Sequence, residues 1–294
     1  MVSRTRAALW TNERAACDNT REGTMNELLV RTATAVAAIV VFLVLTFFAP
    51  DWLWALFIAC VIGVAAWEWG RLVKLSAIEA VGYAGVTVAL LALLWRVTGI
   101  STGAIHAPVA AAAVIPALFF WVALAPVMVW FQIPLRSRSI GLVLGWVTLL
   151  GAGIAALGLR EVSSGLLLAA VTLVWIADTA AFFVGRRYGS RKLLEAVSPG
   201  KTWAGFWGAL GAVAAYGAVL YPVMGVGQGV FGWVLAFVGV ALLAVTGDLF
   251  ESWLKRNAGV KDSGGTLPGH GGVLDRIDTL LAVLPIAALW WLHW

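Results

Sequence analysis

The chain has 294 residues, of which 62% are hydrophobic and 12% are charged, and its net charge is +5. This composition excludes an ordinary soluble domain, and the 17 Trp and repeated apolar stretches argue against nucleic acid as the reason for the positive charge. Cys17 and Cys60 form no disulfide framework, and three His without a Cys cluster argue against zinc, so a metal here would need oxygen ligands.

Residues 1–24 form a polar segment without the continuous apolar core that a cleavable signal peptide needs. Two interpretations of this segment stay open: either translation starts at Met25, or the segment is a cytoplasmic tail. After it we expect an N-terminal membrane region over residues 25–160 and a C-terminal membrane region over residues 161–294.

Nine stretches are long and apolar enough to cross a bilayer of about 30 Å. They cover Leu28–Ala49, Trp52–Trp69, Ala77–Trp95, Ala107–Phe131, Ile140–Leu159, Gly165–Val184, Trp203–Val226, Val230–Phe250 and Val273–Trp294. Because backbone groups in lipid must be satisfied within the segment, each stretch is expected to be a helix. The predicted fold is therefore all-α, a polytopic bundle of transmembrane helices.

Lys and Arg gather in alternate loops between these stretches. If the N-terminus is cytoplasmic, 18 of the 20 basic residues fall in the N-terminal segment and the inner loops, and only Arg96 and Arg160 fall outside. Basic residues are enriched on the cytoplasmic side of membrane proteins. We therefore predict a cytoplasmic N-terminus and a periplasmic or external C-terminus.

Small residues recur inside two of the expected helices, at Gly151 and Gly153 in the fifth and at Gly205, Gly208 and Gly211 in the seventh. In membrane helices such residues most often allow close packing against a neighbouring helix. We interpret them as packing positions and not as parts of a nucleotide-binding loop.

Acidic residues of the second half gather at or near the ends of three expected helices: Asp178, Asp248, Glu251, Asp275 and Asp278. Ionisable groups at membrane depth are costly and usually functional, although any one of them can instead reach the interface or pair with a nearby Arg. As a set, the five carboxylates favour a functional site.

The eighth helix places four polar residues on one face, at positions i, i+3, i+4 and i+7: Asp248, Glu251, Ser252 and Lys255. Asp275 and Asp278 are three residues apart and can likewise point the same way. Carboxylate oxygens hold Mg²⁺ while it bridges to substrate phosphates, and without a cation these carboxylates would repel one another. The pattern predicts a Mg²⁺ site, with one divalent ion, two, or a divalent and a monovalent ion all left open.

Two loops of the second half combine basic residues with glycine. The glycines from Gly264 to Gly272 permit tight backbone approach and expose amides that can cradle anionic oxygens. The other loop ends in Gly200-Lys201-Thr202, like the tail of a P-loop, but Glu195 replaces the required glycine and no strand is expected before it. We reject a P-loop and retain Lys201 as a phosphate-binding candidate.

The segment after the eighth helix carries a long motif made of Ser252-x-Leu254-Lys255-Arg256, Lys261-Asp262 and Leu267-Pro268-Gly269-His270-Gly271-Gly272-Val273-x-Asp275-Arg276-Ile277-Asp278. This motif resembles the signature of the phosphatidate cytidylyltransferases, also called CDP-diacylglycerol synthases. Further likeness lies upstream, at Asp178, Gly185, Ser198-Pro199-x-Lys201-Thr202 and Gly247-Asp248. The chain departs from the family at Ala204, where many relatives have a polar side chain, often Glu.

The resemblance implies that the C-terminal region, residues 161–294, transfers the cytidylyl group of CTP to phosphatidic acid, forming CDP-diacylglycerol and pyrophosphate. It implies Mg²⁺ as cofactor, with Asp248, Asp275 and Asp278 as core ligands or their close support and Asp178 and Glu251 next to them. It implies phosphate contact for Lys201, Lys255, Arg256 and Lys261. It implies nucleotide contact for Gly269, Gly271 and Gly272. The other implied site residues lie within the motif and are Ser252, Asp262, His270 and Arg276. For His270 an orienting role or a hydrogen bond to phosphate is preferred over proton transfer.

The implied partners are CTP, phosphatidic acid and membrane lipids, with no nucleic acid, and the implied location is the plasma (inner) membrane with the active site on the cytoplasmic side. The oligomeric state is open, with a homodimer as one candidate. Two other enzymes meet the same physical needs, a CTP-dependent lipid kinase and a cytidylyltransferase for another lipid phosphate. A membrane transporter is the alternative outside the enzymes, although the charges gather at helix ends and not at the bilayer midplane.

Overall fold

The structure is a computed structural model that describes residues 32–224, 229–267 and 271–292. The described part of the chain is helical, as predicted, except for turns and one short hairpin. The helices, with η1 a 3₁₀ turn and η2 a π turn, are α2 (Asp51–Leu72), α3 (Ala77–Val97), η1 (Ile100–Thr102), α4 (Ala107–Phe119), η2 (Phe120–Leu124), α5 (Ala125–Trp130), α6 (Arg138–Val162), α7 (Ser164–Tyr188), α8 (Trp203–Met224), α9 (Val230–Ala258) and α10 (Leu274–Leu292). A further helix, Thr32–Phe48, precedes α2. The polar segment 1–24 lies outside the described residues.

Seven of the described helices are long and apolar enough to cross a membrane, when Ala107–Trp130 is counted as one. The sequence predicted nine spans. The first of these corresponds to the shorter helix Thr32–Phe48, and the ninth corresponds to α10, which carries three charged residues in its first two turns. The chain is thus a polytopic membrane protein, while membrane crossing by these two helices stays a prediction.

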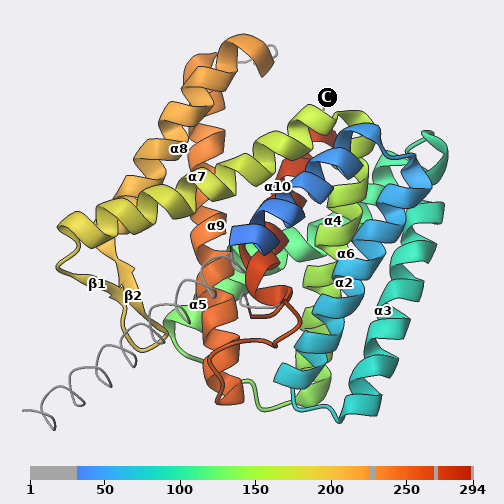
Figure 1. The fold of residues 1–294 in the computed structure, drawn as a ribbon, viewed down its shortest axis with the longest axis horizontal. Helices are drawn as coiled ribbons and strands as arrows, with labels where there is room; N and C mark the ends of the chain where they lie inside the picture. The colour runs from blue at the N-terminus through green and yellow to red at the C-terminus, as the bar shows by residue number, and fades with distance from the viewer. Residues whose placement is uncertain (1–31, 225–228, 268–270, 293–294) are drawn as a thin grey trace, which may run out of the picture.

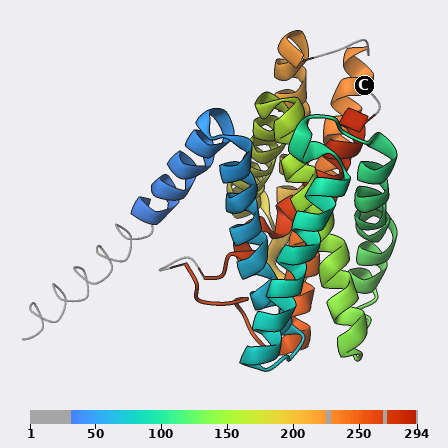
Figure 2. The same ribbon diagram turned by 90° about the vertical axis from the view of Figure 1, so that its right-hand side faces the viewer.

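α10 lies in the middle of the bundle, where it contacts α9, α6, α4 and α7 (Figures 1 and 2). The helices α2, α3, α4 and α6 pack on one side of it, α8 and α9 lie on the other side, and α7 runs diagonally across the bundle from one side to the other (Figure 1). Leu274, Leu281, Ala282 and Val283 of α10 are all buried. The polar first turns of α10 therefore begin inside the bundle, between helices from both halves of the chain.

Hydrogen bonds to side chains cap the N-terminal ends of α3 and α8. At α3, Ser76 Oγ accepts a hydrogen bond from Glu79 N at 3.3 Å, and Glu79 Oε2 accepts one from Ser76 N at 2.7 Å. At α8, Thr202 Oγ1 accepts a hydrogen bond from Gly205 N at 3.2 Å. These contacts satisfy amide groups that have no partner within the first turn of a helix.

The fourth expected span is one continuous path that contains the π turn η2 between α4 and α5. Pro126 follows this turn and has no N–H to donate to the preceding turn, so a regular α-helix cannot continue unchanged through it. The wide turn places Phe120 and Trp121 in the core, where they contact Phe250 of α9 with ring centroids 5.0 and 5.4 Å away. This aromatic contact supports the segment of α9 that carries the acidic residues.

Four of the five glycines interpreted as packing positions are confirmed. A Cβ atom would lie 2.4 Å from Ala117 Cβ at Gly151, 2.9 Å from Leu91 Cδ1 at Gly153, 2.7 Å from the Ala181 carbonyl oxygen at Gly205 and 2.7 Å from Val184 Cβ at Gly208. Gly211 is different, because nothing lies within 4 Å of the place where its Cβ would be. The interpretation of Gly211 as a packing position was wrong.

The basic loop after α7 folds into a two-stranded antiparallel hairpin of β1 (Lys192–Leu194) and β2 (Ser198–Thr202). The expectation that no strand lies here was wrong. Gly200-Lys201-Thr202 nevertheless lies within β2 and not in a loop, so it does not form the phosphate-binding loop of a P-loop. The hairpin instead leads directly into α8 and projects beside α9 (Figure 1).

The helices α9 and α10 approach each other closely at Gly247, where an added Cβ would lie 2.9 Å from the Asp278 carbonyl oxygen and 3.2 Å from Thr279 Cα. We predict that Gly247→Ala lowers the free energy of unfolding by about 1–3 kcal/mol, because backbone atoms cannot move aside as a side chain can. The measurement is thermal unfolding of the purified protein in detergent. Gly239→Ala is the matched control in the same helix, since nothing lies within 4 Å of its added Cβ. Equal unfolding temperatures of the two variants would contradict the prediction.

Candidate active site

An acidic cavity of about 260 Å³ lies where α7, α9, α10 and the loop before α10 meet. Its lining consists of Asp178, Asp248, Glu251, Lys255, Asp262, Asp275, Arg276, Asp278 and Thr279. The five acidic residues singled out in the sequence come from three helices, and all five line this one space. The convergence that the sequence analysis expected is therefore present in the fold.

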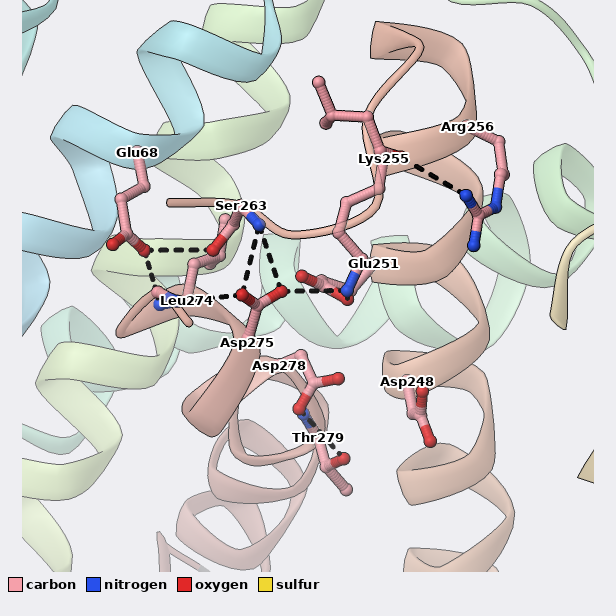
Figure 3. Close-up of polar contacts among 12 residues, drawn as sticks. Glu68, Asp248, Glu251, Lys255, Arg256, Ser263, Leu274, Asp275, Asp278 and Thr279 are labelled. Carbon is pink, nitrogen blue, oxygen red and sulfur yellow. Dashed lines mark hydrogen bonds and ion pairs between the residues drawn. The ribbon is translucent and has the colours of Figure 1, made fainter. Parts of the chain in front are cut away.

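On α9, the acidic face is organised around Lys255. Its Nζ lies 2.5 Å from Glu251 Oε2 on the same helix and 2.8 Å from Asp275 Oδ1 on α10 (Figure 3). Glu251 is 4% exposed, and its other oxygen, Oε1, is buried with no hydrogen-bond partner among the described residues. Of the four residues predicted to share one face of this helix, Asp248, Glu251 and Lys255 line the cavity, whereas Ser252 is not among its lining residues.

The turn of α9 that carries these side chains is held by aromatic rings. Phe250 and Trp253 are 1% and 2% exposed, and their ring centroids lie 5.1 Å apart. Phe250 also stacks on Trp69 of α2 at 6.1 Å. Such contacts restrict the rotation of α9, so that Glu251 is directed into the cavity and not into lipid.

Asp275, in the first turn of α10, accepts hydrogen bonds from two backbone amides besides the Lys255 ammonium. Ser263 N lies 3.2 and 3.1 Å from its two oxygens, and Gly272 N lies 2.9 Å from Oδ2. A carboxylate is also stabilised at a helix N-terminus by the helix dipole. Asp275 is thus fixed from three directions. One turn further on, Asp278 accepts hydrogen bonds from the amide and hydroxyl of Thr279, at 2.7 and 3.3 Å.

Asp248 forms an ion pair with Lys201, the phosphate-binding candidate at the end of β2. Both residues also line a second cavity, of about 500 Å³, between α7, α8, α9 and the hairpin. This cavity shares Asp178 and Asp248 with the acidic cavity and includes Arg186 and Lys192 together with apolar side chains of α7 and α8. Its mixture of cationic and apolar groups suits an amphiphilic anion.

Glu68 of α2 is a site residue that the sequence analysis missed. It is completely buried, and its carboxylate accepts four hydrogen bonds from described residues of the loop and the start of α10, of which Figure 3 shows those from Ser263 and Leu274. The donors are Ser263 Oγ at 3.1 Å, Thr266 Oγ1 at 2.5 Å, Val273 N at 3.1 Å and Leu274 N at 2.7 Å. The signal was present in the sequence, because Glu68 is a lone acidic residue inside an apolar span, where such residues are costly.

The glycine-rich loop approaches these carboxylates closely. A Cβ at Gly272 would lie 2.1 Å from Ser263 Oγ and 2.6 Å from Glu68 Oε2, and one at Gly264 would lie 2.7 Å from Glu68 Oε1. Gly271 has a φ of 81°, a conformation that side chains rarely adopt. The loop was expected to cradle anionic oxygens, and in this structure the oxygens that its amides hold belong to Glu68 and Asp275.

The other predicted site residues are placed less centrally. Asp262 and Arg276 are exposed and line the acidic cavity, whereas Arg256 and Lys261 are exposed and are not among its lining residues. Arg256 donates to the Val260 carbonyl at 3.4 Å. Gly269 and His270 lie outside the described residues.

The donor atoms of the cavity can be compared with the needs of a metal ion. Within the described residues, no three His, Cys, Asp or Glu side chains are close enough together to bind one ion. Two lysines form ion pairs with three of the carboxylates, Lys201 with Asp248 and Lys255 with Glu251 and Asp275. The lining still offers only oxygen atoms as ligands, from the carboxylates and the Thr279 hydroxyl, with the buried Glu251 Oε1 free to accept, and this chemistry fits Mg²⁺ better than a softer metal.

Residues 29–293 match the cytidylyltransferase family. The chain is 38% identical over 253 residues to the phosphatidate cytidylyltransferase of Pseudomonas aeruginosa, which covers 81% of this chain and 87% of that protein. It is 45% identical over 124 residues to the phosphatidate cytidylyltransferase of Haemophilus influenzae, covering 41% and 43% of the two chains. The enzyme of the same name from Brucella suis is 44% identical over 117 residues, covering 40% and 43%.

The family match extends over nearly all of the chain and includes every residue that lines the acidic cavity. The relative from Pseudomonas aeruginosa matches over most of its own length as well. This chain therefore belongs to the cytidylyltransferase family.

Proposed function

We propose that this chain transfers the cytidylyl group of CTP to phosphatidic acid, forming CDP-diacylglycerol and pyrophosphate. The observation that carries the proposal is the acidic cavity, in which carboxylates from α7, α9 and α10 meet Lys255, and whose Asp248 pairs with Lys201 of the second cavity. Its supports are the membership of the chain in the cytidylyltransferase family and the names of its relatives.

The proposed reaction does not need a strong general base. A phosphomonoester has a second pKa of about 6, so an oxygen of phosphatidate is already largely ionised near neutral pH. This oxygen attacks the α-phosphorus of CTP, the bond from the α-phosphorus to the oxygen that bridges to the β-phosphate breaks, and pyrophosphate leaves with that electron pair. Catalysis then consists of positioning two polyanions and neutralising their charge.

The side chains of the cavity are suited to both tasks. We assign Lys255, which lines the acidic cavity, and Lys201, which lines the second cavity beside it, to phosphate binding, because each can exchange its carboxylate partner for a phosphate oxygen. Mg²⁺ would be held by one or two carboxylates of the set Asp178, Asp248, Glu251, Asp275 and Asp278, together with water and the phosphate oxygens of the substrate. Bound there, Mg²⁺ would neutralise charge on the α-phosphate and the departing pyrophosphate. Arg186 and Lys192, in the second cavity, would face the phosphate of the lipid, whose acyl chains would lie along the apolar surface of α7 and α8.

The finer location is part of the proposal: a plasma (inner) membrane with the N-terminus and the active site on the cytoplasmic side and the C-terminus outside. The basic ends of α2, α6 and α9 lie together at the lower edge of the bundle in Figure 1, with Arg71, Arg138 and Arg256 at these ends. Arg96 and Arg160 end α3 and α6 at the opposite edge. The structure describes one chain, so the homodimer stays a prediction from the sequence.

The reaction is tested by giving the purified protein phosphatidate and CTP labelled at the α- or the γ-phosphate. We expect the α-label on the lipid and the γ-label in released pyrophosphate, because CMP is the group transferred. A CTP-dependent lipid kinase would place the γ-label on the lipid and leave CDP. A lipid-supplied protein that consumes no CTP would contradict both enzymes and favour a transporter.

The carboxylates are tested by Asp248→Asn and Asp275→Asn. Each removes a negative charge from the cavity and leaves the side-chain shape nearly unchanged, so we expect turnover to fall by at least about 100-fold while membrane insertion is retained. Turnover is measured as pyrophosphate release, and insertion by size-exclusion chromatography of detergent extracts. Glu79→Gln, at the cap of α3 and outside the cavity, is the matched control and should have little effect. Near-normal turnover in both Asp variants would contradict the assignment of metal ligands.

Metal dependence is a separate prediction. Dialysis against EDTA is expected to abolish pyrophosphate release, and added Mg²⁺ is expected to restore it. Ca²⁺ should restore it poorly, because it prefers longer bonds and more ligands. Full activity after complete removal of divalent ions would contradict the proposed cofactor.

A further inference from the structure

Glu68 shows no direct contact with the acidic cavity, yet it is the most completely buried acidic side chain of the site. It sits on α2, in the half of the chain that carries none of the cavity residues. Its four hydrogen-bond donors among the described residues are uncharged groups, so its stabilisation depends on the number and geometry of these donors. A buried carboxylate that lost them would be strongly unfavourable.

The partners of Glu68 lead directly to the cavity. Ser263 donates its hydroxyl to Glu68 and its backbone amide to Asp275 (Figure 3). Leu274, whose amide also donates to Glu68, immediately precedes Asp275 in the first turn of α10. Asp275 in turn contacts Lys255, which contacts Glu251. A continuous polar path therefore runs from α2 to the carboxylates of α9.

We propose that Glu68 is a positioning residue for cytidylyl transfer, which holds Ser263 and the first turn of α10 so that Asp275 faces Lys255 across the cavity. This role rests on the proposed function and adds to it the N-terminal half of the chain. Without Glu68 the loop would lose its only described contact with a carboxylate of α2, and Asp275 would lose the fixed amide of Ser263.

The geometry explains why glutamine cannot take the place of Glu68. Oε1 accepts from Val273 N and from the Thr266 hydroxyl, while Oε2 accepts from Leu274 N and from the Ser263 hydroxyl. Each oxygen thus faces one backbone N–H. A side-chain amide has only one oxygen, so either orientation would direct its NH₂ group against a backbone donor.

The loop has little freedom to relax around such a change. Gly264 and Gly272 already place their backbone in contact with the carboxylate, since a Cβ would lie within 2.7 Å of a Glu68 oxygen at both positions. Moving the loop away from Glu68 would carry Ser263 and Gly272 with it, and both donate their amides to Asp275. A disturbance at position 68 therefore reaches Asp275 and is not absorbed by the loop.

The test compares Glu68→Gln with the wild-type chain and with Glu79→Gln. The control carries the same substitution at an exposed capping glutamate, whose hydrogen bonds in the described part of the chain are to Ser76 at the start of its own helix. Three quantities are measured on protein that elutes as a single size-exclusion peak, well below its unfolding temperature: kcat, KM for CTP and equilibrium binding of CTP in the presence of Mg²⁺. A purely structural role would reduce the folded fraction and leave these values of the folded protein unchanged.

We expect kcat of folded Glu68→Gln to fall about 10- to 100-fold, the usual effect of removing a group that orients metal-binding side chains. CTP binding with Mg²⁺ should weaken as well, and Glu79→Gln should match the wild type in all three quantities. Folded Glu68→Gln protein with wild-type kcat and CTP affinity would overturn the proposal.

Ser263→Ala provides the second variant, because it removes one donor to Glu68 and keeps the amide that holds Asp275. We expect kcat to fall about fivefold, the effect of one hydrogen bond. Combined with Glu68→Gln, it should cause no further fall, since both act on one path. Additive effects would overturn the proposal. If Glu68→Gln does not fold, the proposal is tested by Ser263→Ala alone. A Ser263→Ala variant with the kcat of the wild type would then overturn the proposal.

These outcomes are separable from a failure of the proposed function. A wild-type chain that releases no pyrophosphate from CTP and phosphatidate would contradict cytidylyl transfer itself. An active wild-type chain with an equally active, folded Glu68→Gln variant would leave the reaction standing and remove only the role of Glu68.

Discussion

The contact of the Lys255 ammonium with Glu251 on α9 and Asp275 on α10 is the interaction on which the site depends. Carboxylates inside a membrane protein are tolerated only when charge or hydrogen bonds compensate for the loss of water. One lysine compensates two carboxylates from different helices and thereby fixes the distance between those helices. The close approach at Gly247 and the aromatic rings around Phe250 keep α9 in the orientation that this contact needs.

The two halves of the chain contribute in different ways. The second half supplies all the charged residues that line the acidic cavity, on α7, α9, α10 and the loop before α10. The first half supplies the rings of Phe120, Trp121 and Trp69 against Phe250, and the carboxylate of Glu68 against the start of α10. The charged residues of the acidic cavity therefore all come from the second half of the chain, whereas their positions depend on contacts with both halves.

Features that depend on local periodicity were predictable from the sequence. Asp248, Glu251 and Lys255 share a face because helical spacing alone requires it, and the glycine at 151 marks a helix contact because few other roles suit it in lipid. The hairpin was missed because short strands in a basic loop have no periodic signal. Glu68 was missed because its role depends on donors nearly 200 positions away, and the empty space beside Gly211 is likewise visible only in three dimensions.

The lining of the acidic cavity has a consequence for how its ligands arrive. Six of its side chains are acidic and two are basic, so acidic groups outnumber basic groups around the space. A bare triphosphate would be repelled from it, whereas in a site lined mainly by arginine it would be attracted. Entry of the nucleotide is therefore thermodynamically linked to uptake of positive charge, and each ligand should raise the affinity of the chain for the other by the same factor.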